Sequence, residues 1–156
     1  MRIRREEALP VYERLGDVRE RAVTMGKIAD ILQSRGDLDE ALRIRREEAL
    51  PVYERLGDVR LRAVTMGKIA DILQSRGDLD EALRIRREEQ LPVYERLGDV
   101  RELLVCRANL AMALQERDQP GDRQEAKRLL TLALVSAASL KIPEAATVEA
   151  LLKKTK

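Results

Sequence analysis

The sequence contains no histidine, no phenylalanine and no tryptophan, and among its 156 residues there are three tyrosines and one cysteine. Without histidine the chain has no imidazole to act as a base, a proton carrier or a metal ligand. The single cysteine, Cys106, excludes a disulfide within the chain and is expected to be a buried or half-buried structural thiol. We therefore expect no catalytic residues, no metal site and no bound cofactor.

The sequence also lacks long apolar runs and an excess of charge of one sign. No run approaches the roughly 20 apolar residues that a membrane-spanning helix needs, and the N-terminal segment MRIRREE has no apolar stretch typical of a secretory signal. The 30 basic and 28 acidic side chains nearly balance, whereas nucleic-acid-binding surfaces are strongly basic. The composition indicates a cytoplasmic protein that binds neither membranes nor nucleic acid.

The most informative feature that is present is an internal repeat. Residues 2–42 and 43–83 are identical except that Leu61 replaces Glu20, and a third copy begins at Arg84 and differs only at Gln90 as far as Arg101. A fixed period, 41 residues from Arg2 to Arg43, predicts a stacked array in which each unit buries its apolar surface against its neighbours.

Each unit predicts two helices joined by short turns. The first helix is predicted over residues 18–34, where apolar residues at steps of four and three form one stripe. Asp17 is placed to cap its N-terminus and Gly36 to end it. The stripe consists of Val18, Ala22, Met25, Ala29 and Leu32.

The second helix of the unit is predicted from Leu38 to about Leu56, with Asp37 as its N-cap. Pro51 falls inside this helix. A proline in a helix interior removes a backbone hydrogen bond and clashes with the carbonyl four residues earlier. We therefore expect a kink or a short break near residues 48–51, repeated in each copy.

Large and small apolar residues, a glycine and an alanine recur in each hairpin, at the same spacing in the first two and with a three-residue insertion around Asp118, Gln119 and Pro120 in the third. They are Ile28, Ala29, Leu32, Gly36 and Ala41; Ile69, Ala70, Leu73, Gly77 and Ala82; and Leu110, Ala111, Leu114, Gly121 and Ala126. This pattern resembles the tetratricopeptide repeat (TPR), and the long period resembles the variety found in kinesin light chains and bacterial signalling proteins. The resemblance implies an all-α solenoid of TPR-like helical hairpins, wound as a right-handed superhelix.

The repeats predict five segments along the chain. The first is an orphan second helix of a truncated repeat, followed by two full units, a divergent third unit and a C-terminal capping helix. Their expected bounds are residues 1–16, 17–57, 58–98, 99–142 and 143–156.

The resemblance also implies a function. In the family, the first helices of successive units line a concave groove that holds a peptide or a helix of a partner protein, so the chain is expected to be a non-enzymatic interaction module or scaffold. The residues carried over onto this groove are Val23, Gly26, Lys27, Asp30, Gln33, Val64, Gly67, Lys68, Asp71, Gln74, Val105, Asn109 and Met112.

The sequence leaves other interpretations open. Lys27 and Asp30 also have the spacing of an ordinary solvated pair on one helix. Near-identical repeats suit end-to-end stacking or dimerisation, and they also suit an engineered or recently duplicated array that has no native ligand. The candidate self-association residues are Ile3, Leu9, Tyr12 and Leu61.

Overall fold

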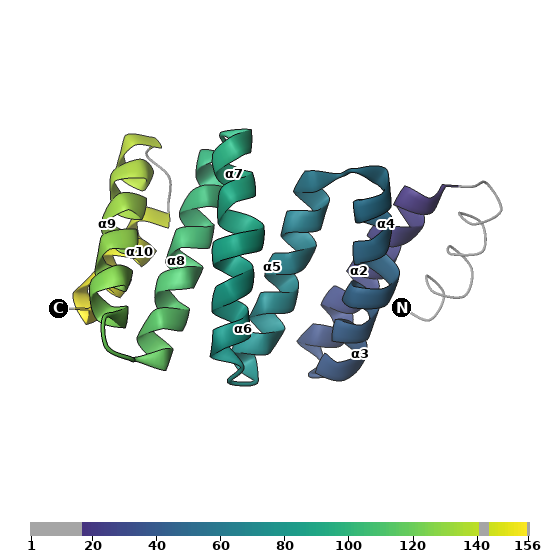
Figure 1. The fold of residues 1–156 in the computed structure, drawn as a ribbon, viewed down its shortest axis with the longest axis horizontal. Coiled ribbons are helices and arrows are strands. Elements are labelled where there is room, and N and C mark those ends of the chain that lie inside the picture. The colour runs from purple at the N-terminus through teal and green to yellow at the C-terminus, as the bar shows by residue number, and fades with distance from the viewer. Residues whose placement is uncertain (1–16, 141–143, 156) are drawn as a thin grey trace. The chain divides into compact units, whose positions relative to one another are not determined.

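The structure, a computed structural model, describes residues 17–140 and 144–155 of the chain. Every element in these ranges is a helix (Figure 1), which confirms the all-α, TPR-like arrangement. The chain divides into two compact units, Met1–Ile72 and Leu73–Lys156. This division falls inside a helix and follows packing rather than sequence repetition, so the five segments expected from the repeats stay predictions.

The first unit contains one complete helical hairpin and most of the next helix. Its first helix, α2, has the predicted bounds and packs against every part of the second half of the hairpin. Ala29 and Ala41 are completely buried, and because their side chains are small the two halves approach closely. The elements are α2 (Val18–Ser34), α3 (Leu38–Arg43), a π-helical segment η2 (Ile44–Ala49), α4 (Leu50–Leu56) and α5 (Val59–Ser75).

A left-handed glycine turn ends α2, as the sequence predicted. Gly36 has a φ of +85°, a value that side-chain-bearing residues rarely adopt. The Asp37 N–H donates to the Leu32 carbonyl at 2.8 Å, and the Gly36 N–H donates to the Gln33 carbonyl at 3.0 Å. These two bonds satisfy carbonyls that the helix end would otherwise leave free. Positive φ values also occur at Gly57, Gly77, Gly98 and Gly121.

The aspartates that precede the first helices act as N-caps. The Asp17 carboxylate accepts a hydrogen bond from the Glu20 N–H at 2.9 Å, and the Asp58 carboxylate accepts one from the Leu61 N–H at 3.1 Å. The cap therefore survives the replacement of Glu20 by Leu61, because the bond uses the backbone of that residue.

Asp37 occupies the N-cap position of the second helix, as predicted, but its side chain makes no capping hydrogen bond. Asp39 and Glu40 place two carboxylates in the first turn of α3. Their negative charge complements the helix dipole.

The second half of the hairpin is continuous through its proline. The π-helical segment η2 runs directly into α4, which has Pro51 in its first turn. The Leu50 N–H donates to the carbonyl of Arg45, five residues earlier, and the backbone departs most from α-helical values at Ala49 (φ −97°, ψ −54°). Pro51 has no N–H to donate, and the helix continues through it after a widened π-helical turn over Ile44–Ala49. The expected short break is therefore absent, and the backbone distortion falls at Ala49, within the range 48–51 where a kink or break was expected.

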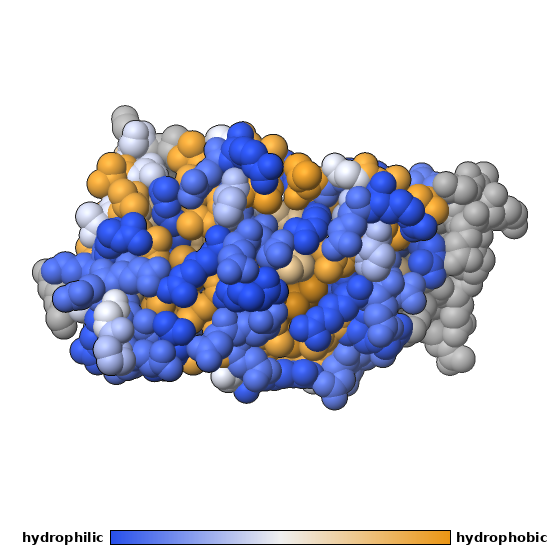
Figure 2. Space-filling model, viewed as in Figure 1, coloured by the Kyte–Doolittle hydropathy of each residue, from blue (hydrophilic) through white to orange (hydrophobic). Residues whose placement is uncertain are grey.

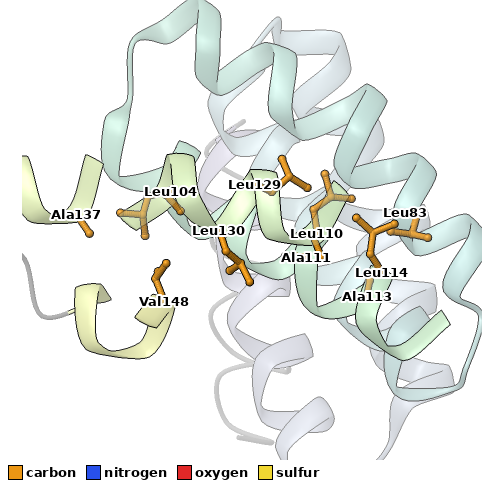
Figure 3. Close-up of a cluster of buried hydrophobic side chains, with 12 residues drawn as sticks. Leu83, Leu104, Leu110, Ala111, Ala113, Leu114, Leu129, Leu130, Ala137 and Val148 are labelled. Atoms are coloured by element: carbon orange, nitrogen blue, oxygen red, sulfur yellow. The ribbon is translucent and has the colours of Figure 1, made fainter. Parts of the chain in front are cut away.

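The second unit contains the second half of the second hairpin, the third hairpin and a final helix. Figure 3 shows leucines and alanines of α8 and α9 along the seam between these helices, with Val148 contributed by α10. No π-helical segment interrupts α9, and its sequence has no proline. The elements are α6 (Leu79–Arg84), a π-helical segment η3 (Ile85–Gln90), α7 (Leu91–Leu97), α8 (Val100–Arg117), α9 (Asp122–Leu140) and α10 (Glu144–Lys154).

A buried ion pair holds the turn between α8 and α9. The Arg117 guanidinium donates to both oxygens of Asp122, at 2.9 and 2.8 Å, and the Gln119 N–H donates to the same carboxylate at 3.0 Å. The Asp122 side chain is only 5% exposed. These bonds, led by those from Arg117, lower the pKa of Asp122 to about 2 from an ordinary value of 3.8.

Acid should therefore destabilise the second unit through Asp122. A carboxyl group whose pKa is lowered by folding stabilises the folded state above about pH 4 and loses that contribution as the pH falls towards 2. Asp122→Asn should remove about 1–2 kcal/mol of this pH-dependent stability, since a tenfold change in proton affinity is worth about 1.4 kcal/mol. Urea unfolding between pH 2 and pH 6 measures it. Asp118→Asn, which alters the exposed pair with Arg123, is the control and should leave the pH dependence unchanged.

Candidate functional site

The first-helix face of the first unit is the surface formed by the groove residues predicted on α2 and on the part of α5 in that unit. Lys27, Asp30 and Asp71 are exposed on it, and Val64 is 36% exposed. Gly67 is buried, so its backbone is not available to a ligand. Half-buried positions are Val23, Gly26, Gln33 and Lys68.

Asp30 is the centre of the polar contacts on this face. Its Oδ1 accepts a hydrogen bond from Arg45 Nη2 at 2.5 Å and lies 3.8 Å from Lys68 Nζ. Arg45 Nη2 also lies 3.4 Å from Gln33 Oε1. Asp30 therefore joins the second half of its own hairpin to the first helix of the next repeat. The structure gives this role to Asp30 in place of the simple pair with Lys27 that its spacing also allowed.

Arg45 is the residue that the sequence analysis missed. Its side chain is only 4% exposed, whereas Asp30 is 52% exposed, so a buried cation supports an accessible carboxylate. A buried guanidinium is costly unless a carboxylate pairs with it, and removing Asp30 would leave Arg45 without that partner. The signal was present in the sequence, because Arg45 lies four residues after Ala41 and four before Ala49, both buried.

The corresponding residues of the second unit form a less charged surface. Val105 packs against the core of that unit, Asn109 is half-buried and Met112 is 37% exposed. Gln74 Nε2 donates to Glu116 Oε1 at 2.8 Å, which links the end of α5 to α8.

The final helix α10 lies along α8 and occupies part of its surface. Arg101 pairs with Glu144 at 2.7 Å near the start of both helices. Gln115 Nε2 donates to the Leu151 carbonyl at 3.2 Å and to Thr155 Oγ1 at 2.5 Å near their ends.

A family model described as Tetratricopeptide repeat matches residues 20–89. Residues 20–89 belong to the TPR family. This match covers the first near-identical copy from residue 20 and the whole of the second, and it includes Asp30, Arg45 and Lys68.

Solved structures extend the TPR-like arrangement to nearly the whole chain. A Podosopora anserina protein assigned as a kinesin light chain, with nearly identical TPR-like repeats, has a TM-score of 0.70 at 19% identity, and the match covers 99% of this chain and 85% of that one. BtubC (BKLC) from P. vanneervenii has a TM-score of 0.73 at 21% identity, covering 94% of this chain and 59% of that one. Comparison with curated proteins found no match. At these identities the likeness shows the fold alone.

Of the predicted self-association residues, only Leu61 lies among the described residues. Leu61 is half-buried and packs against the cluster around Ala22 and Tyr53. Ile3, Leu9 and Tyr12 lie outside the described residues.

Figure 2 shows a face on which hydrophilic residues dominate and hydrophobic residues form patches between them.

The only cysteine is buried within the second unit, as expected. Cys106 is 2% exposed, and burial raises the pKa of its thiol to about 12. A thiol with this pKa stays protonated near neutral pH and is a poor nucleophile. In residues 17–140 and 144–155, no group of acidic and cysteine side chains is arranged to hold a metal ion, and no helix there is both long and apolar enough to cross a bilayer.

Gly26 lies on the first-helix face with open space at its Cα. Apart from its chain neighbours and the backbone of its own helix, no atom of the described residues lies within 4 Å of the position that a Cβ would occupy there. A glycine inside a helix nevertheless destabilises it by roughly 0.5–1 kcal/mol relative to alanine. Among the described residues, no contact at Gly26 accounts for this loss of stability.

Gly26→Ala should raise the free energy of unfolding by about 0.5–1 kcal/mol, because alanine restricts the unfolded chain and fits the helix. Gly36→Ala is the matched control: its Cβ would also meet no atom within 4 Å, but its positive φ strains alanine and should lower stability by about 1 kcal/mol. Urea unfolding followed by circular dichroism measures both. A loss of stability in Gly26→Ala would show that this position is tighter than the structure indicates.

Proposed function

We propose that the chain is a non-enzymatic interaction module that binds a peptide or a partner helix along the first-helix face. TPR domains are generally protein–protein interaction modules, and the finer assignment to this face is our proposal. The observation that supports it best is the bridge from Arg45 through Asp30 to Lys68. The bridge holds charged groups of two successive first helices in fixed positions, and such preorganisation lowers the entropic cost of binding.

The two lysines of the face favour an acidic ligand, whereas Asp71, also exposed there, does not. Asp30 is already paired with a buried arginine, so its negative charge is largely compensated. Lys27 is exposed, and the Lys68 side chain is 44% exposed. Two ammonium groups one repeat apart are thus available to carboxylates of an extended or helical peptide, and charge complementarity of this kind steers association and sets register.

Charge reversal tests this proposal. The variant Lys27→Glu/Lys68→Glu should lose at least about tenfold in affinity for acidic members of an array of short synthetic peptides, because attraction becomes repulsion. Arg46→Glu/Arg55→Glu is the matched control, since it makes the same change of net charge at exposed residues of η2 and α4. The control should retain binding, and circular dichroism should show that both variants stay folded.

The possible outcomes distinguish an error in the assignment to the first-helix face from an error in the proposal of peptide binding. Equal loss in both double variants would indicate a general charge effect and contradict the assignment to the first-helix face. Failure of the wild-type chain to bind any peptide of the array would contradict peptide binding itself. Light scattering on the same samples tests the alternative of self-association, which predicts a molar mass that rises with concentration. Cytoplasmic location remains an expectation from composition.

A further inference from the structure

The near-identical repeats differ at two buried positions that meet in the second unit. Gln90 replaces Ala49 of the preceding copy, and Cys106 replaces Thr65. Gln90 is 6% exposed and Cys106 is 2% exposed. They belong to η3 and α8, so they lie at the contact between the second half of one hairpin and the first helix of the next.

In the second unit the two side chains share a polar contact. Cys106 Sγ lies 3.9 Å from Gln90 Oε1 and 3.7 Å from the Arg86 carbonyl oxygen, both within hydrogen-bonding range for a thiol donor. Arg86 Nη1 donates to the same Gln90 oxygen at 3.3 Å. Tyr94, 1% exposed, also bonds the Gln90 side chain. Gln90 is therefore held on several sides by groups that α8 and its own hairpin supply.

In the first unit the corresponding positions are held differently. Ala49 is 1% exposed and packs in an apolar cluster with Val52 and Tyr53. Thr65 is 6% exposed, and its hydroxyl donates to the Leu61 carbonyl of its own helix at 2.8 Å. The threonine hydroxyl is thus satisfied within α5 and presents no donor to the preceding hairpin.

We propose that Gln90 and Cys106 form a matched pair that makes α8 stack on its own preceding hairpin and not on the other near-identical copy. In a wrong pairing of Gln90 with threonine, the threonine hydroxyl is bonded within its own helix and its methyl group lies against a buried amide. In a wrong pairing of Ala49 with cysteine, the thiol loses the amide acceptor and the smaller side chain leaves space. Both mismatches are penalised, because buried polar groups need partners and buried space is costly.

The sequences around Ala49 and Gln90 are the same, so the two positions can be compared directly. The stretch RIRREE precedes both positions and LPVYERLGDVR follows both. The second half of the hairpin that receives the first helix is thus the same in the two copies except at this residue. The pair therefore supplies a buried difference that distinguishes otherwise interchangeable hairpins during folding.

A double-mutant cycle in each unit tests the proposal. In the second unit, Gln90→Ala and Cys106→Thr should each lower the urea midpoint of unfolding, and the double variant, which recreates the Ala49 and Thr65 combination, should recover at least half of the summed loss. In the first unit, Ala49→Gln should lower the midpoint and Thr65→Cys added to it should restore it. Losses that simply add in both cycles would overturn the proposal.

Thiol labelling provides a second readout that does not require unfolding. Gln90→Ala retains Cys106, and opening of the contact should let a disulfide reagent reach the thiol at least about threefold faster than in the wild-type chain at the same pH. An unchanged labelling rate would show that Gln90 does not hold the contact closed. If Ala49→Gln fails to fold, rescue by Thr65→Cys supports the pair, and failure of rescue contradicts it.

Discussion

The buried guanidinium of Arg45 is the interaction on which the first unit and its candidate site depend. A cation without solvent needs a carboxylate within hydrogen-bonding distance, and Asp30 supplies it from the facing helix. The same carboxylate reaches Lys68 on the next first helix. One buried charge thereby links the two halves of a hairpin, holds the exposed acid of the first-helix face in place and connects that face to the following repeat.

The third hairpin lacks the buried arginine. Counting from the matched alanines Ala41 and Ala126, the position of Arg45 is taken by Leu130, which is completely buried in the apolar core of the second unit. The proline is missing as well, and α9 continues without a π-helical segment. The widened turn thus accompanies the pair of features, buried arginine and following proline, that the two near-identical copies share.

The few residues that differ between the near-identical copies do not all have the same effect on packing. Leu61, the only difference between the first two copies, leaves the N-cap in place and adds apolar packing. Gln90 and Cys106 are instead both buried and in contact. Buried polar differences bear more strongly on which surfaces fit together, because a buried donor or acceptor tolerates fewer alternative partners than an apolar side chain does.

The sequence by itself determined the helices, their ends and the family. The apolar period, the Asp17 cap and the Gly36 turn act over one or two helical turns, so they are readable without knowing what packs where. The sequence also located the candidate face by resemblance. Only the tertiary structure decided the partners of Asp30 and the half-buried state of Leu61. Asp30 and Lys68 are 38 positions apart, and such contacts exist only after the helices have packed. The widened turn before Pro51 also appeared only in the structure, although its hydrogen bond from Leu50 to Arg45 is local.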